Sequence, residues 1–486
     1  MVFPLTLFGF QSEVNRWKKI LFIISINCLV FYFFVVIFHA RGLGNMNNGD
    51  SNNLVAGAST AIECIRSQSF TGCGLLDGGH SSVFPYALLQ YIPASLVILA
   101  GGSSEFTLHF LVWLNIGAVV MIYVVGSLSL RKSIGKVSLF LCLLLASSLN
   151  YQMTAAFSEP LAALVILCFV VALKNEKPLL TIIFGLLSSV SKETMFPVLF
   201  MLALGIVLQS GQKGESWRDL LRKMCPASVG IISGLVLNGL FNVFRFETWR
   251  NTMYLGEELR TEGLVRSAAY FVGQFISPSS GLLVFWPVWS SLLVVSVMAM
   301  SFRARGDGIE WGLLAVFIAI VTSSASLAVW YSPFGWLALG PRLMVPVLPA
   351  TGFLMIEFLE DSRNLFKTKA KHLALKVTLA ASTLASIVLV VPLTFSPWTW
   401  SRGVSALIQP SDDCIGFLNA PIQSEKAAYY ACADEMMFRF TPSVVRQLVN
   451  PSWTMDGLGW LWGFVTMVVL LILASEYLLA STERDR

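Results

Sequence analysis

Four charged residues of this chain stand beside apolar segments, where their side chains are suited to chemistry: Asp50, Glu159, Lys192 and Arg342. Asp50 lies in the run 47–53, which is too polar to enter lipid and contains a glycine that permits a sharp turn. A carboxylate at the mouth of an apolar bundle is a candidate general base. The structural alternative is that Asp50 caps a short interfacial helix expected over 54–65.

The other three residues each have a chemical and a structural interpretation. Glu159 opens an apolar segment, where it is either a second catalytic acid or an anion favoured by a helix N-terminus. Lys192 lies next to Glu193 in a tight hairpin, where it is either a phosphate ligand or part of a solvated turn. Arg342 is isolated among apolar residues, and its planar guanidinium suits phosphate oxygens. Its alternative role is to anchor a lipid headgroup at an aromatic belt.

The elements that position these residues are predicted to be membrane spans. The chain has 486 residues, of which 56% are hydrophobic and 13% charged. Its apolar residues come in runs long enough to cross a bilayer, which excludes a water-soluble globule. We expect an all-α polytopic membrane protein, with spans at 20–39, 106–130, 137–150, 158–173, 178–191, 195–209, 226–244, 281–301, 311–330, 343–359, 377–395 and 457–480.

Charge distribution sets the orientation of these spans. With both termini in the cytoplasm, Lys and Arg are concentrated on the inner side, as the positive-inside rule requires. The net charge of +5 therefore reflects topology and gives no indication of nucleic-acid binding. The apolar stretch 83–101 is expected to lie along the outer surface or to re-enter the membrane, because a further crossing would invert every later loop.

We expect a single integral membrane domain over 1–486 with three long outer loops, at 40–105, 245–280 and 396–456. The first loop carries interfacial helices and Asp50. Cys64 and Cys73 share this loop, and Cys414 and Cys432 share the last one, which favours two local disulfides in an oxidising compartment. The alternative is that these cysteines are free small hydrophobic residues. No Cys or His spacing indicates zinc.

Several short motifs, in order along nearly the whole chain, carry a resemblance to a known family. They are Gly49-Asp50, Val83-Phe84-Pro85-Tyr86, Ser158-Glu159-Pro160-Leu161, Ser279-Ser280-Gly281-Leu282-Leu283 with Trp286-Pro287, and Gly340-Pro341-Arg342. The pattern resembles the GT-C glycosyltransferases, and more closely the dolichyl-phosphate-mannose-protein mannosyltransferase-like group of bacterial membrane enzymes.

This resemblance implies a GT-C-like bundle and an inverting sugar transfer on the outer face of the bacterial plasma membrane, from a polyprenyl-phosphate sugar to a glycan, lipid or protein acceptor. It places the catalytic acid of the first outer loop at Asp50 and a second acidic position at Glu159. Arg342 and then Lys192 are the expected donor-phosphate ligands. No second acidic residue stands beside Asp50, so a divalent metal is not indicated, and we name no cofactor. The alternative function is a multi-span transporter or flippase of a lipid-linked or small substrate.

Overall fold

The computed structural model describes residues 16–40, 49–68, 70–73, 87–153, 158–212, 214–251, 260–277, 280–303, 310–330, 332–334, 341–359 and 430. These residues form α-helices, one 3-10 helix and an isolated bridge between Arg260 and Trp330. The helices are α1 (Arg16–Ala40), α2 (Gly49–Arg66), α3 (Leu88–Leu99), α4 (Ser104–Ser129), α5 (Ile134–Leu145), α6 (Leu149–Gln152), α7 (Glu159–Lys174), α8 (Pro178–Ser189), α9 (Met195–Gly211), α10 (Trp217–Phe246), α12 (Leu264–Ile276), α13 (Leu282–Phe285), α14 (Pro287–Arg303), α15 (Trp311–Ala328), η3 (Arg342–Met344) and α16 (Leu348–Phe358).

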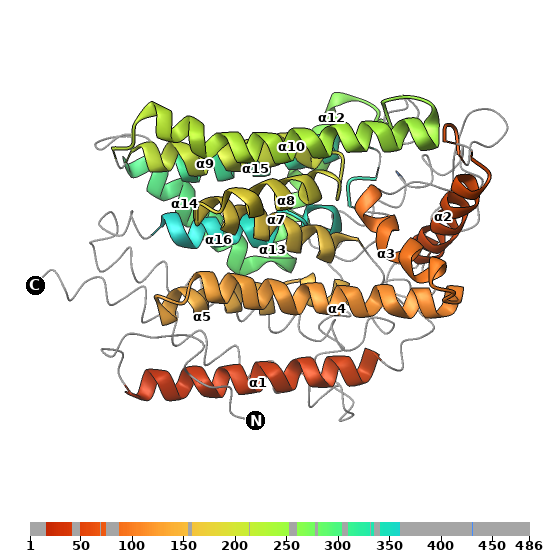
Figure 1. Ribbon diagram of the computed structural model, residues 1–486. Helices are drawn as coiled ribbons and strands as arrows, with labels where there is room; N and C mark the ends of the chain where they lie inside the picture. Colours follow the sequence, from red (N-terminus) through yellow and green to blue (C-terminus); the bar gives the residue numbers. More distant parts are fainter. Residues whose placement is uncertain are drawn as a thin grey trace, which may run out of the picture.

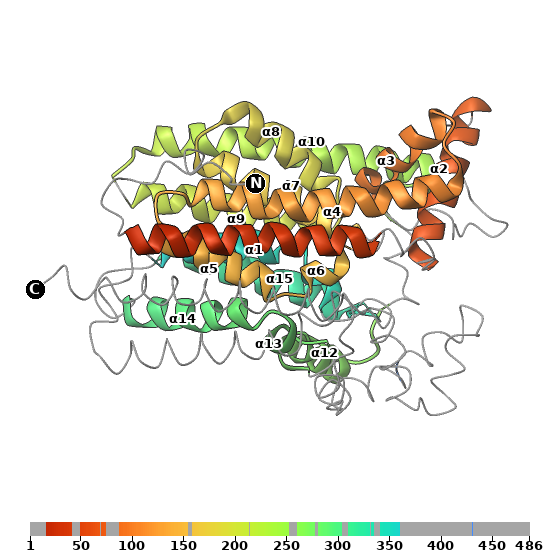
Figure 2. The ribbon, with the colours of Figure 1, turned by 90° about the horizontal axis from the view of Figure 1, so that it is seen from below.

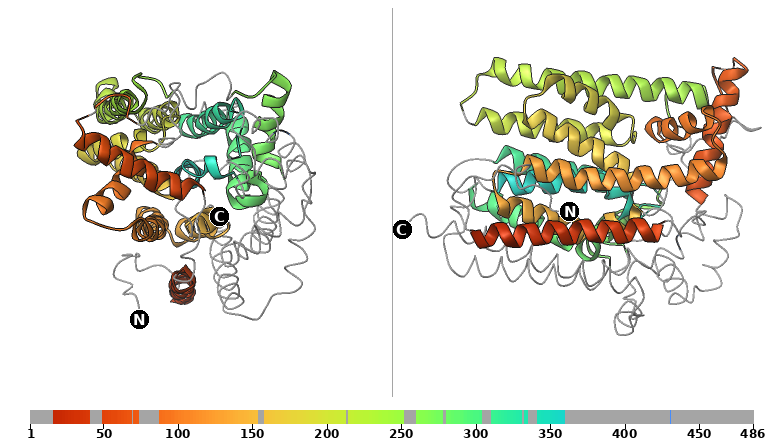
Figure 3. Two further views of the ribbon diagram at one scale, coloured as in Figure 1. Left: turned by 90° about the vertical axis from the view of Figure 1, so that its right-hand side faces the viewer. Right: turned by 60° about the horizontal axis from the view of Figure 1, so that its bottom comes forward.

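The long helices run side by side, and α2 and α3 lie together at one end of them (Figures 1 and 2). Seen along the bundle, α2 lies across one part of the bundle end (Figure 3, left). We call this end of the bundle the α2 end. Among the described helices, α4, α10 and α15 are each long and apolar enough to cross a membrane. The protein is thus an all-α polytopic membrane protein, as the sequence predicts.

The described part of the stretch 83–101, residues 87–101, does not cross the bundle. Its helix α3 begins beside the hairpin between α8 and α9, where the Leu89 amide donates a hydrogen bond of 3.1 Å to the Val190 carbonyl. The next helix, α4, starts at the same end, since its Leu111 belongs to one apolar cluster with Leu54 of α2 and Tyr91 of α3. Because α3 begins and ends at the α2 end, it packs there as an extra helix.

Three of the expected spans are interrupted. The segment 137–150 divides into α5 and α6, and 281–301 divides into α13 and α14 at Pro287. The segment 343–359 begins with the 3-10 turn η3, and α16 follows only from Leu348. Proline lacks an amide hydrogen and clashes with the preceding helical turn, so Pro287 and Pro346 break helices that their apolar neighbours would otherwise continue. The two spans predicted at 377–395 and 457–480 lie outside the described residues.

Close packing of α8 on α10 positions the hairpin that carries Lys192. A Cβ atom added at Gly230 would lie 2.5 Å from the Ile182 carbonyl oxygen, and one at Gly234 would lie 2.7 Å from that of Leu186. Two glycines four residues apart are a common means of bringing membrane helices together. The contact continues to the end of α8, where the Asn238 side-chain amide donates a 2.6 Å hydrogen bond to the Ser189 carbonyl.

Two fully buried tryptophans fix the helices behind η3. The indole N–H of Trp286 donates a 3.0 Å hydrogen bond to the Ser148 hydroxyl, and that of Trp289 donates one of 3.0 Å to the Thr351 hydroxyl. Satisfied polar atoms let these large side chains lie in the core without an unpaired donor. The first bond links the end of α13 to the turn before α6, and the second links α14 to α16. Because α16 follows η3, these bonds help to hold the segment that begins with Arg342.

Candidate functional site

Three of the charged residues selected from the sequence meet at the α2 end. One carboxylate oxygen of Glu159, Oε1, accepts hydrogen bonds from Lys192 Nζ and from Arg342 Nε, each at 3.2 Å. The exposed fractions of the side chains are 2% for Glu159, 9% for Arg342 and 16% for Lys192. We call these three residues the charged triad. They come from the first residue of α7, the α8–α9 hairpin and η3, so tertiary structure alone brings them together.

Burial makes this arrangement energetically significant. Transferring charges out of water is costly, and close pairing with good hydrogen bonds is what offsets the cost. Two cations share one carboxylate, which gives the three side chains a net charge of +1. A nearly buried group of side chains with a net positive charge is suited to an anion such as phosphate.

The start of α3 lies directly against the triad. Besides the Leu89 bond to α8, the Gln90 side-chain amide donates a 3.3 Å hydrogen bond to the carbonyl of Ser191, the residue before Lys192. Leu89, Val165 and Val190 form a small apolar cluster beneath this contact. The start of α3 therefore fixes the hairpin on which Lys192 stands.

A second polar network holds the same hairpin from the side of α10. The guanidinium of Arg245 is fully buried between the rings of Phe241 and Phe246, with centroid distances of 4.7 and 4.5 Å. It donates hydrogen bonds to the carboxylate of Glu193 and to the Asn242 side-chain oxygen. Burial raises the pKa of Glu193 above its ordinary value, and this guanidinium opposes the rise. Glu193 is thus paired with α10 and is not merely part of a solvated turn.

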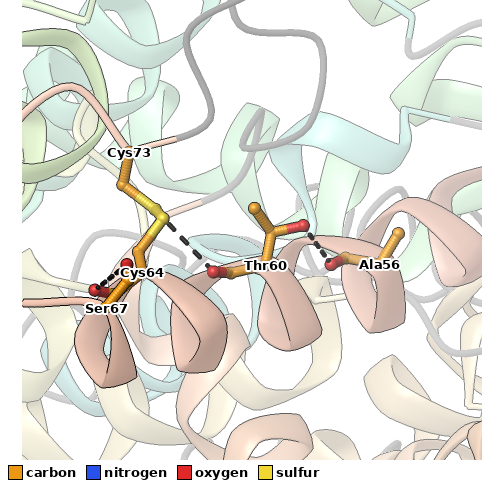
Figure 4. Close-up of a disulfide and its surroundings, with 5 residues drawn as sticks. All are labelled: Ala56, Thr60, Cys64, Ser67 and Cys73. Carbon is orange, nitrogen blue, oxygen red and sulfur yellow. Dashed lines mark hydrogen bonds between the residues drawn. A yellow bond between two sulfur atoms is a disulfide. The ribbon is translucent and has the colours of Figure 1, made fainter. Parts of the chain in front are cut away.

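A disulfide helps to fasten α2 to the bundle. The structure contains the expected bridge between Cys64 and Cys73, which links the last turn of α2 to the segment that follows it (Figure 4). The Cys73 amide donates a 2.8 Å hydrogen bond to the carbonyl of Phe244 in α10. Through this segment α2 is attached to the end of α10. The other expected pair, Cys414 and Cys432, lies outside the described residues.

Asp50 is the second residue of α2. The helix begins at Gly49, several residues earlier than the expected 54–65, so the polar run before Leu54 is largely helical and Asp50 lies in the first helical turn. A carboxylate in a first turn interacts favourably with the helix N-terminus. The Asp50 side chain lies outside the described part of the chain, and its catalytic role remains a prediction.

Among the described residues, no three His, Cys, Asp or Glu side chains gather in a way that could hold a metal ion. The charged triad itself contains a single carboxylate among two cations. Its donor groups are suited to an anion and not to a metal cation.

No protein-family model matches the chain, and no curated protein matches it. Among solved structures it is similar to ArnT from Cupriavidus metallidurans, in a crystal structure bound to undecaprenyl phosphate, with a TM-score of 0.45 and 14% sequence identity. The match covers 86% of this chain and 77% of that one. At this level of similarity, fold family and function have to be argued from the residues of this chain.

The Arg245 network was not anticipated from the sequence, although a signal for it exists. Arg245 lies in Asn-Val-Phe-Arg-Phe at the end of an apolar segment, and a cation flanked by aromatic residues often packs against their rings. The pairing of Arg342 and Lys192 with Glu159, in contrast, had no signal, because these residues are far apart in sequence and hydropathy does not reveal which helices are neighbours.

Proposed function

We propose that this protein is a membrane glycosyltransferase that moves a sugar from a polyprenyl-phosphate-linked donor to an acceptor on the outer face of the membrane, with inversion at the anomeric carbon. Lys192 and Arg342 bind the donor phosphate, and Asp50 is the general base. The prenyl chain lies among the membrane helices.

The observation that supports this proposal best is the charged triad. Two cations from separate elements converge at the end of an apolar bundle, at a place that the start of α3 contacts directly. A lipid phosphate has one charged end and one long apolar end. It therefore needs this combination of a cationic site and an adjoining apolar bundle.

The chemistry follows from the charges. The acceptor hydroxyl attacks the anomeric carbon from the face opposite the phosphate and passes its proton to the Asp50 carboxylate. The bond between the anomeric carbon and the phosphate oxygen breaks, and the phosphate keeps the electron pair. The negative charge that develops on the phosphate is stabilised by Lys192 and Arg342, because fixed cations in a water-poor site act strongly on developing charge.

The test of the base is Asp50→Asn, which keeps the shape of the side chain but removes its ability to accept a proton. Turnover of polyprenyl-phosphate sugars, followed as donor loss by mass spectrometry, should fall by about 10² or more, with little change in stability. If Asp50 only stabilises the first turn of α2, Asp50→Asn is nearly silent and Asp50→Ala costs about 1 kcal/mol. Transfer at the wild-type rate by Asp50→Asn would end the catalytic assignment of Asp50.

The same assay separates the enzyme from a transporter or flippase. A transporter moves the lipid-linked sugar across proteoliposome membranes without cleaving it, whereas a glycosyltransferase releases the polyprenyl phosphate. Loss of intact donor together with formation of lipid phosphate supports the proposed function. Translocation of intact donor without cleavage would contradict it.

A further inference from the structure

Glu159 places a negative charge beside Lys192 and Arg342, the same two cations that are proposed to bind the negatively charged phosphate. It holds both cations at 3.2 Å and is itself almost completely buried. If the two cations served only to attract phosphate, this carboxylate would oppose them. A carboxylate at this position is therefore expected to affect which phosphate charge the site prefers.

That reason lies in the difference between the donor and the product of the proposed reaction, on which this inference rests. A polyprenyl-phosphate sugar is a phosphodiester with one negative charge. When the bond from the anomeric carbon to phosphate breaks, the released polyprenyl phosphate is a monoester, which carries close to two negative charges because its second pKa is near 6. Donor and product thus differ by one unit of charge at the same phosphorus atom.

We propose that Glu159 adjusts the charge of the site to the donor. With Glu159 present, the charged triad has a net charge of +1 and matches the monoanionic diester. The cost of removing an ion from water grows with the square of its charge, whereas its attraction to the site grows only linearly. A site with a charge of +1 therefore binds the diester well and does not retain the dianionic product, so Glu159 promotes product release and selects phosphodiesters over phosphomonoesters.

The size of the effect follows from Coulomb's law. Donor and product differ by one negative charge, and that extra charge interacts with the charge of Glu159. For unit charges roughly 6 Å apart and an effective dielectric constant of about 20, this interaction changes the ratio of the two affinities by up to about a hundredfold. Removing the Glu159 charge should shift the preference of the site towards the monoester by that factor.

The experiment measures binding of two probes with the same prenyl chain, undecaprenyl phosphate and its methyl phosphodiester, to the full-length protein in detergent. Wild type should bind the diester at least as tightly as the monoester. Glu159→Gln should shift the affinity ratio towards the monoester at least about tenfold, whereas Glu159→Asp, which keeps the charge, should leave it near the wild-type value. Glu105→Gln is the matched control: it removes one carboxylate from an exposed position at the start of α4, so the ratio should not change.

The outcomes separate this inference from the proposed function. If Glu159→Gln leaves the ratio unchanged while Arg342→Ala weakens both probes, the charge-adjusting role is wrong and the phosphate site stands. If neither Arg342→Ala nor Lys192→Ala changes the affinity of either probe, the phosphate site itself is wrong. Should Glu159→Gln fail to fold, the wild type still decides, because a clear preference of the wild type for the monoester contradicts the inference.

Discussion

We predict that the charged triad contributes more to sugar-transfer activity than to the free energy of unfolding, and a series of substitutions tests this. Glu159, Lys192 and Arg342 bury three charges in the network, and pairing only partly offsets the cost of removing them from water. Replacing a whole buried ionic group with apolar side chains of similar size is often neutral or stabilising by about 1–4 kcal/mol. We therefore predict that the triple variant Glu159→Leu, Lys192→Met, Arg342→Met folds as stably as the wild type.

Single substitutions should behave differently, because each changes the balance of charge within the triad. Glu159→Leu leaves two nearly buried cations facing each other and should reduce the free energy of unfolding by about 3–5 kcal/mol. Arg342→Met removes the charge-assisted hydrogen bond to Glu159 but leaves Lys192 beside that carboxylate, so we expect a smaller cost of about 1.5–3 kcal/mol. Lys192→Met should cost least, because Lys192 is the most exposed of the three.

The assay is thermal unfolding of the purified proteins in the same detergent, with sugar-transfer activity measured in parallel. The expected order of apparent Tm is wild type and triple variant highest, then Lys192→Met, Arg342→Met and Glu159→Leu, with the triple variant inactive. A triple variant as unstable as Glu159→Leu would show that the triad holds the fold together. A stable triple variant that still transfers sugar would refute the phosphate site.

Three further predictions concern neighbouring features of the α2 end. Replacing Cys64 and Cys73 by serine should destabilise the protein by about 2–3 kcal/mol, since the bridge closes a short loop, and a Tm unchanged by this substitution would contradict that role. Arg342→Lys keeps the charge but loses the planar fork, so polyprenyl-phosphate affinity should fall about tenfold while the protein still folds, and an unchanged affinity would return Arg342 to a lipid-anchor role. Arg245→Met should cost about 3 kcal/mol because it leaves the largely buried carboxylate of Glu193 without its cation. The control Arg250→Met, at an exposed position, should leave Tm within about 1 °C of the wild type, and equal shifts of Tm for the two variants would contradict the network.

The sequence was informative about helix positions because apolar runs of span length have few other interpretations. The predicted segments 106–130, 195–209, 226–244 and 311–330 coincide with α4, α9, α10 and α15 within a few residues, except that α10 extends well beyond its apolar part at its start. The amphipathic start of α10 carries several charges, so hydropathy could not reveal that it is helical. The disulfide between Cys64 and Cys73 was predictable for a similar reason, since two cysteines close together in one predicted loop have few alternative partners.

The geometry of the site was not predictable in the same way. The sequence indicates Arg342 as a phosphate ligand because it is a cation among apolar residues, Lys192 because it stands in the hairpin between two spans, and Glu159 separately as an acid that opens a span. Whether they meet depends on the close packing of α8 on α10 through Gly230 and Gly234, and on the proline breaks that place η3 at the α2 end. A single sequence contains the residues but not the pairing of helices.

This difference bears directly on how Glu159 should be understood. From the sequence, its position at the first residue of a helix is explained equally well by a catalytic acid and by the favourable field of a helix N-terminus. In the structure, it accepts hydrogen bonds from two cations that come from other elements, so the helix N-terminus alone does not account for its place. A residue held in this way is well suited to set the charge of a site and badly placed to move through a proton-transfer step. The general base is then best sought outside the triad, which is why the first turn of α2, with Asp50, is the place where the proposed mechanism is most directly tested.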